Sequence, residues 1–163
     1  MRVRHAEPGD AEAIARIYNQ GIEDREATFE TRPRSADEVR SWLEDPVPAV
    51  VAIEDDQVVA WAAAHPYRPG RPVYRGVGEF SVYVERDSRG RGAGRVVMDA
   101  LLEECRRRGF WKLVARVFPE NAASRRLCAA LGFREVGVYR RHARLDGAWR
   151  DCVIVERLLD DEG

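Results

Sequence analysis

The chain has 163 residues, of which 34% are charged, and its formal net charge is −1. This length is typical of one domain, and we expect residues 1–163 to form it. The balanced charge argues against nucleic acid as a partner, because binding it needs a strong basic excess. No apolar run approaches the roughly 18 residues of a membrane span, and no apolar segment of a secretory signal follows the N-terminus. We therefore expect no membrane contact and a cytoplasmic location.

Apolar periodicity and turn residues divide the chain into strands and helices. The first helix opens at Pro8-Gly9-Asp10, with Gly21 near its end, and the second opens at a predicted capping box, Ser35-Ala36-Asp37-Glu38, and ends before Pro46. In chain order we predict a strand at 1–6, these two helices, strands at 49–53, 58–64 and 77–85, a helix at 93–108, a strand at 110–118, a helix at 121–131, and strands at 133–141 and 149–159 around a turn at Asp146-Gly147. This order is typical of an α/β domain with one mixed sheet and helices on both faces.

Several chemistries are disfavoured by what the sequence lacks. Lys112 is its one lysine, so a phosphate-binding loop that ends in Gly-Lys-Ser/Thr is absent. The three cysteines and three histidines are far apart and show no Cys-x-x-Cys or His-Glu-x-x-His spacing. We therefore predict no metal site and no disulfide framework, and reduced thiols fit the cytosol. Trp42, Trp61 and Trp111 are assigned to the core.

The strongest local signal is Arg89-Gly90-Arg91-Gly92-Ala93-Gly94-Arg95, between a predicted strand and a predicted helix. Small residues let the backbone approach a ligand closely, and the helix N-terminus adds partial positive charge. This pattern predicts a cradle for a pyrophosphate. A dinucleotide-binding loop would instead show G-x-G-x-x-G and an acidic residue about 20 positions on, and neither is present. Taken alone, the loop is also compatible with a plain surface turn.

Together with its neighbours, the loop resembles the acyl-CoA-binding motif of the GNAT N-acetyltransferase superfamily, Gln/Arg-x-x-Gly-x-Gly/Ala, which Arg89, Gly92 and Gly94 match. The strand at 81–84 and the segment from Asn121 to Phe133 match further signature positions. The resemblance covers nearly the whole chain. It implies the single-domain GNAT acyl-CoA N-acyltransferase fold, with a mostly antiparallel twisted sheet, and acetyl-CoA as cosubstrate.

Within that superfamily the chain is similar to the phosphinothricin and methionine sulfoximine acetyltransferases, and most similar to a branch known for arsinothricin resistance. The first similarity rests on Ile17-Tyr18-Asn19, Ala27-Thr28-Phe29-Glu30, Arg71-Pro72-Val73-Tyr74-Arg75, the strand at 79–84 and Gly147-Ala148-Trp149-Arg150-Asp151. The second rests on the stretches at 21–25, 110–113 and 116–121. Substrate choice can depend on a few pocket residues, so the branch is a narrower inference than the family.

The resemblance also implies where the cosubstrate binds. Backbone amides of residues 90–95 would hold the CoA pyrophosphate, and the strand at 82–84 would pair with the pantetheine arm as an added strand does. The next strand would diverge from it and leave a gap for the thioester. The implied cofactor-binding residues are Val82, Tyr83, Val84, Arg89, Gly90, Arg91, Gly92, Ala93, Gly94, Arg95, Asn121, Ser124 and Cys128.

The chemistry is direct attack of a neutral amine on the thioester, which requires a base for the ammonium and protonation of the leaving thiolate. Glu79 matches the family's Glu in E-x-S/T-Val-Tyr and is the candidate base; its alternative reading is a solvent-facing strand residue. Many members have Tyr or His at the position of Cys128, as proton donor. We interpret Cys128 as a small core residue, with Tyr83, Tyr139 or water as possible donors.

An amino acid with a second anionic or polar tetrahedral head needs two polar anchors, and an arginine fork suits carboxylate or phosphinate oxygens. The loop before Glu79 supplies the candidates, while Arg68 reads equally well as a solvated charge. Phe29 would pack against the acceptor's apolar stem. The implied substrate-binding residues are Phe29, Arg71, Pro72, Val73, Tyr74 and Arg75. The family resemblance further implies a homodimer.

Three functions are weighed. The leading one is acetylation of the α-amine of a small amino-acid-like substrate, with a role in detoxification. Acetylation of a protein N-terminus or a polyamine uses the same chemistry, although the anchors Arg71 and Arg75 favour an anionic acceptor. A non-catalytic CoA-sensing module is a different class, and the presence of Glu79 argues against it.

Overall fold

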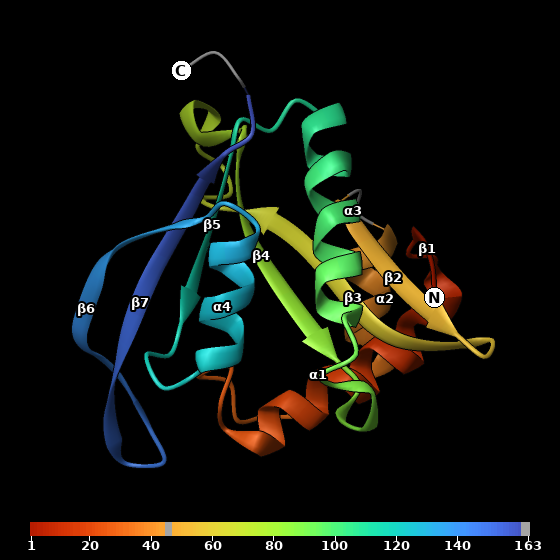
Figure 1. Ribbon diagram of the computed structural model, residues 1–163, viewed down its shortest axis with the longest axis horizontal. Coiled ribbons are helices and arrows are strands. Elements are labelled where there is room, and N and C mark those ends of the chain that lie inside the picture. Colours follow the sequence, from red (N-terminus) through yellow and green to blue (C-terminus); the bar gives the residue numbers. More distant parts are fainter. Residues whose placement is uncertain (45–46, 161–163) are drawn as a thin grey trace.

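The computed structural model describes residues 1–44 and 47–160. Within them one sheet has the strand order β1-β2-β3-β4-β5-β7-β6 (Figure 1). Its strands are β1 (Arg2–His5), β2 (Ala49–Glu54), β3 (Gln57–Pro66), β4 (Val77–Val84), β5 (Lys112–Val117), β6 (Arg134–Leu145) and β7 (Ala148–Leu158). The helices are α1 (Ala11–Asp24), α2 (Ala36–Glu44), α3 (Ala93–Arg107) and α4 (Ala122–Ala130), with short 3-10 turns η1 (Pro8–Asp10), η2 (Pro72–Tyr74) and η3 (Arg86–Ser88).

The sheet is mixed and mostly antiparallel, because β4 and β5 form the parallel pair while the other ladders are antiparallel. Helices cover both faces, as predicted. On one face α1 and α2 pack through Ile14, Ile17 and Val39 against β2 and β3. On the other, α3 packs through Val97 and Leu101 against a second apolar cluster. The α/β fold class predicted from the sequence is confirmed.

The second helix begins with half of the predicted capping box. The Ser35 hydroxyl accepts from the Glu38 amide at 3.1 Å. The Glu38 carboxylate does not return to the cap but accepts from Arg32 at 2.8 Å, because a nearby guanidinium is the stronger donor. The described helix ends at Glu44, and the predicted stop before Pro46 falls at residues 45–46, outside the described residues.

Gly21 lies in the last turn of α1, near its end as predicted, and the helix continues for three more residues to Asp24. A Cβ on Gly21 would lie 2.6 Å from Cε1 of Tyr83. The Tyr83 ring is stacked on Tyr18 and Trp61, with ring centroids 5.0 and 5.2 Å away. The glycine is therefore a point of close approach between helix and sheet.

The last hairpin is longer than predicted. Strand β6 runs to Leu145, past the predicted end at position 141. Its ladder with β7 is interrupted by an irregularity between Tyr139 and Ala143 and then resumes. Asp146 and Gly147 both have positive φ (51° and 81°), the geometry of a tight two-residue hairpin turn.

Of the three tryptophans predicted in the core, Trp61 is buried, whereas Trp42 and Trp111 are half-buried. None of the described helices is long and apolar enough to cross a membrane.

Candidate active site

The site is organised by the divergence of β4 and β5. Their parallel ladder covers Val77 to Glu79 on β4, and the last pair is Glu79 with Val114. Beyond it the strands separate, which confirms the predicted divergence. The strand gap is a narrow cavity of about 70 Å³ whose walls include Val82, Ala115 and Cys128. On that side residues 80–84 of β4 have no neighbouring strand among the described residues.

The glycine loop opens into a larger cavity of about 370 Å³, the loop cavity, next to the strand gap. Gly90 and Gly92 have φ of +80° and +86°, a region that side-chain-bearing residues avoid. The first helical bond of α3 runs from the Val96 amide to the Gly92 carbonyl at 3.1 Å. The amides of residues 93–95 therefore lie at the free, partially positive end of the helix. The predicted residues that line this cavity are Val82, Tyr83, Val84, Arg89, Gly90, Gly92, Gly94, Arg95, Asn121 and Ser124.

Two predicted loop residues do not line the loop cavity with their side chains. Arg91 donates to the Ser88 hydroxyl at 3.2 Å and lies 3.9 Å from Glu54, on a separate surface hollow. Ala93 is buried under the helix start. Small residues, free amides and the guanidinium groups of Arg89 and Arg95 together suit a diphosphate, so the residues present fit the CoA that the sequence predicts.

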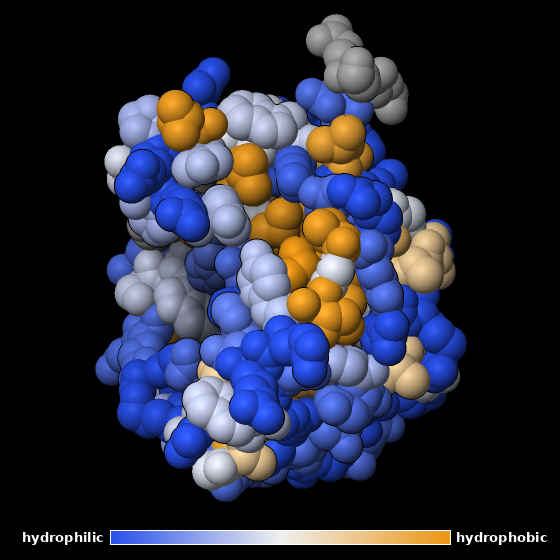
Figure 2. Space-filling model, turned by 90° about the vertical axis from the view of Figure 1, so that its left-hand side faces the viewer, coloured by the Kyte–Doolittle hydropathy of each residue, from blue (hydrophilic) through white to orange (hydrophobic). Residues whose placement is uncertain are grey.

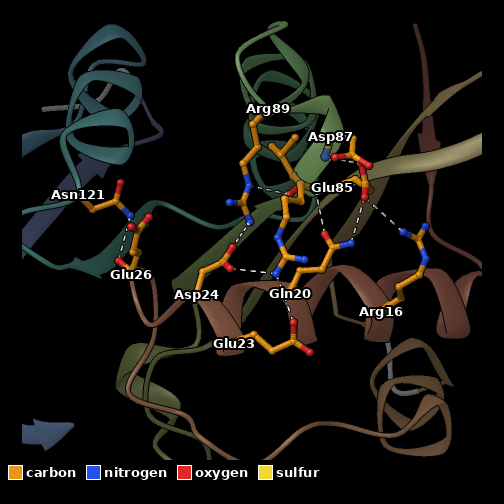
Figure 3. A network of polar contacts seen from close by, with 11 residues as sticks. Arg16, Gln20, Glu23, Asp24, Glu26, Glu85, Asp87, Arg89 and Asn121 are labelled. Carbon is orange, nitrogen blue, oxygen red and sulfur yellow. Dashed lines mark hydrogen bonds and ion pairs between the residues drawn. The ribbon is translucent and has the colours of Figure 1, made fainter. Parts of the chain in front are cut away.

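Asp24, at the end of α1, holds two arginines of this region (Figure 3). Its carboxylate lies 2.8 Å from the Arg89 guanidinium and 2.9 Å from that of Arg86. Burial acts to raise the pKa of Asp24, but hydrogen bonds from both arginines outweigh it and hold that pKa below its ordinary value. Asp24 is not among the residues predicted from the sequence, because its arginine partners lie more than 60 positions away in the chain.

Asn121 links the loop cavity to the segment after α1 (Figure 3). Its Oδ1 accepts from the Ser124 amide at 3.1 Å and so caps α4, while its Nδ2 donates to the Glu26 carbonyl at 3.2 Å. Asn121 and Ser124 line both the loop cavity and the strand gap. One residue thus fixes the helix start and the segment opposite it.

The far side of the strand gap is an inner hollow of about 220 Å³, lined by Glu79, Ser81 and Phe29 among others. Alternation along β4 puts Glu79, Ser81 and Tyr83 on one face and Phe80 on the other. Phe29 packs edge-on against Phe118, with ring centroids 4.9 Å apart. The predicted base and the predicted apolar contact are therefore brought together.

Glu79 forms an ion pair that sequence reasoning did not find. Two nitrogens of Arg116 on β5 reach Glu79 Oε1, Nη2 at 2.8 Å and Nε at 2.9 Å. The second oxygen, Oε2, accepts no hydrogen bond from the residues that the structure describes. A signal was present, since the predicted strand at 110–118 carries two charged residues, Lys112 near its start and Arg116 near its end. The partner of Arg116, however, lies 37 positions earlier in the chain.

The three candidate proton donors occupy different places. Tyr83 lies among aromatic rings, and burial raises the pKa of its phenol. Cys128 is 4% exposed in the apolar core, as predicted, and burial, with a smaller contribution from the Glu135 charge, raises its pKa to about 11. Tyr139 is exposed on β6 and packs on His142 at 4.9 Å.

Beyond Glu79 and Arg116 lies an outer hollow of about 640 Å³, which the loop before β4 borders. Tyr74 lines it as predicted, together with Tyr67 and Arg68. Arg68, which the sequence left as an equally plausible solvated charge, lies over both tyrosine rings at 5.5 and 5.9 Å. The remaining predicted loop residues, Arg71, Pro72, Val73 and Arg75, are exposed and do not line it; the Arg75 guanidinium lies over Trp111 at 5.5 Å.

Comparison with known proteins gives a consistent family. Residues 14–133 match the model of the acetyltransferase (GNAT) family. The phosphinothricin N-acetyltransferase of Streptomyces coelicolor is 31% identical, over 98% of this chain and 96% of that protein. The L-methionine sulfoximine/L-methionine sulfone acetyltransferase of Salmonella typhimurium is also 31% identical, over 99% and 96%.

Solved structures agree with this result. An acetyltransferase from Salmonella typhimurium, determined with its cofactor acetyl-CoA, superposes with a TM-score of 0.95 at 30% identity, over 100% of this chain and 96% of that one. The matched region contains the glycine loop, the divergent strands and Glu79. The chain therefore belongs to the acetyltransferase (GNAT) family and is an N-acetyltransferase.

Proposed function

We propose that the chain transfers the acetyl group of acetyl-CoA to the α-amine of a small amino-acid-like substrate of the phosphinothricin, methionine sulfoximine or arsinothricin type, and that this gives resistance to such compounds. One observation carries the proposal: the strand gap shares lining residues with both the loop cavity and the inner hollow. We infer that the three neighbouring cavities form one path from the glycine loop to Glu79. A cofactor at one end and an amine at the other would meet in the gap.

Acetyl-CoA would bind along the first half of that path and supply the activated acetyl group. The amides of residues 90–95 would hold its diphosphate, with Arg89 and Arg95 adding charge. The unpaired edge of β4 at residues 82–84 would take the pantetheine arm as an added strand. Asn121 and Ser124, which line both cavities, would border the thioester end.

Glu79 would act on the amine. In its ionised form the carboxylate accepts a proton from the α-ammonium, directly or through one water. The neutral nitrogen then attacks the thioester carbonyl carbon, so a C–N bond forms while the C–S bond breaks and the sulfur leaves as a thiolate. The nitrogen releases its second proton as the amide forms, and this proton passes to water. Phe29, on the wall of the inner hollow, would hold the acceptor's apolar stem.

The leaving thiolate needs a proton, and two candidates are poor donors. An ordinary thiol has a pKa of about 8.5, whereas burial raises the pKa of Cys128 to about 11 and also raises that of Tyr83. Proton transfer from either group to a thiolate is uphill. We therefore propose that the proton released from the acetylated nitrogen reaches the thiolate through water or through the exposed Tyr139.

The distal head of the acceptor would lie in the outer hollow. Tyr74 and Arg68 line it, and a guanidinium suits phosphinate, sulfoximine or arsinate oxygens. The other loop residues predicted for the acceptor are exposed and do not line the outer hollow; they are Arg71, Pro72, Val73 and Arg75. We propose that they support the loop that carries Arg68 and Tyr74.

The test is a thiol-release screen with acetyl-CoA over phosphinothricin, methionine sulfoximine, arsinothricin, common amino acids, polyamines and a peptide with a free N-terminus. Turnover of phosphinothricin, methionine sulfoximine or arsinothricin above the other amines is the expected result. Preference for a polyamine or the peptide would replace the proposal by that function. Absence of turnover with every amine, combined with intact CoA binding, would favour a CoA-sensing module.

We also propose that two chains form a homodimer in the cytoplasm. Strand β6 is the edge of the sheet, and large apolar side chains on β6 and β7 are exposed, among them Val138 and Trp149. Figure 2, which looks onto this side of the molecule, shows apolar surface gathered there. Such a patch is typical of an interface. Sedimentation velocity at micromolar concentration tests this, with a single monomer peak as the contrary result.

A further inference from the structure

Arg116 is placed where it can contact the reacting molecule. It lies on β5 just past the last β4–β5 pair, and its side chain borders the strand gap, the inner hollow and the outer hollow. The side chain is 53% exposed, and Glu79 is its one ion-pair partner within residues 1–44 and 47–160. A surface pair of this kind contributes about 0–1 kcal/mol to stability, so the fold gains little from it.

We propose that Arg116 binds the α-carboxylate of the acceptor, so that the Glu79–Arg116 pair recognises the zwitterionic end of an amino acid; this inference rests on the proposed function. An amino acid carries its ammonium and carboxylate on one carbon, and the pair presents the complementary charges 2.8 Å apart. An acceptor placed with its ammonium on Glu79 therefore has its carboxylate beside the guanidinium.

Both side chains have capacity for these contacts. Arg116 directs two nitrogens at a single oxygen of Glu79, and a guanidinium has five N–H donors in a planar fork that suits a carboxylate. Glu79 keeps Oε2 for the ammonium. Transfer of the fork from Glu79 to the acceptor would leave the Glu79 carboxylate facing the ammonium whose proton it accepts.

The same pair discriminates between amines. A polyamine, or an amino acid amide, offers Glu79 an ammonium but leaves the Arg116 guanidinium without a carboxylate, and a polyamine adds a second positive charge near it. The distal head is read elsewhere, at Arg68 and Tyr74 in the outer hollow. The structure therefore separates recognition of the α-carbon end from recognition of the distal head.

The probe is methionine sulfone, because its distal head is uncharged and its α-carboxylate is its one negative charge, compared with its α-carboxamide. Affinity for each is measured by calorimetry on the CoA-loaded protein, and kcat/KM by thiol release. The variants are Arg116→Gln and Arg116→Lys. The matched control is Arg134→Gln, an exposed arginine of β6 that pairs with Glu156 and lines none of these cavities.

A hydrogen bond to a charged group contributes about 1.5–3 kcal/mol. The native protein and Arg134→Gln should therefore prefer methionine sulfone over its α-carboxamide by roughly 10- to 100-fold. Arg116→Gln should lower this preference to within about threefold while CoA affinity and the unfolding midpoint stay unchanged, and Arg116→Lys should be intermediate. An unchanged preference in Arg116→Gln, or equal binding of acid and amide by the native protein, overturns the assignment of Arg116. The proposed function fails separately, if bound amino acids are not acetylated.

Discussion

Replacement of Glu79 by glutamine removes the carboxylate but keeps the size of the side chain and an oxygen that can accept from Arg116. Glu79 does not line the loop cavity, so CoA affinity should be unchanged. A positioned general base contributes roughly 10²- to 10⁴-fold, so we expect kcat/KM at pH 7 to fall at least 100-fold, which is about 2.7 kcal/mol of transition-state stabilisation. The lost ion pair should cost no more than about 1 kcal/mol of stability.

The pH dependence of the Glu79→Gln variant separates a base from a binding residue. An α-ammonium with a pKa of about 8–9 is roughly 1–10% neutral at pH 7 and roughly 50–90% neutral at pH 9. If Glu79 removes this proton, the defect should shrink about ten- to fiftyfold between these pH values, as measured by thiol release at subsaturating acceptor. Activity within threefold of the native protein at pH 7, or a defect that does not vary with pH, would refute the role of Glu79 as base.

Three further substitutions test the parts of the site. Gly92→Val forces a β-branched residue into φ of +86° and should weaken CoA binding at least tenfold by calorimetry; Gly70→Val, with φ of +83° away from the loop cavity, is the matched control that should bind CoA normally. Cys128→Ala should leave kcat within about threefold, because the pKa of about 11 makes this thiol a weak donor; a collapse of kcat in a folded variant would restore it as the acid. Gly21→Ala gains about 1 kcal/mol of helix propensity, but the new methyl group overlaps Tyr83, and this overlap should cost about 1–3 kcal/mol of stability. The unfolding midpoint should therefore fall; an unchanged or raised midpoint would show that Tyr83 can move aside.

The order of elements could be predicted because each depends on local information. Apolar residues at helical or alternating spacing specify the helices and strands, and glycines at 90 and 92 adopt the positive φ that their loop requires. Boundaries were less secure where long-range contacts decide them. Strand β6 resumes after its irregularity because β7 continues to pair with it, and no residue within β6 signals this.

The roles of the loop arginines show where sequence reasoning stops. Arg68, Arg71 and Arg75 lie within eight positions of one another, and their chemistry is identical. Packing distinguishes them: Arg68 rests on Tyr67 and Tyr74 at the outer hollow, while Arg75 lies over Trp111. Those ring positions depend on how the loop meets β5, which spacing along the loop does not encode.

The charged partners of the site follow the same logic at longer range. Asp24 meets Arg89 between α1 and the glycine loop, whereas Glu79 meets Arg116 between β4 and β5. The first pair depends on how α1 packs beside β4, and the second depends on the strand order and register. Glu79 is the last β4 residue paired with β5, and Arg116 comes two residues after its partner Val114. Side chains alternate along a strand, so residues 114 and 116 share a face. Given the register, the meeting of Glu79 and Arg116 at the mouth of the strand gap is a direct consequence of where the ladder ends.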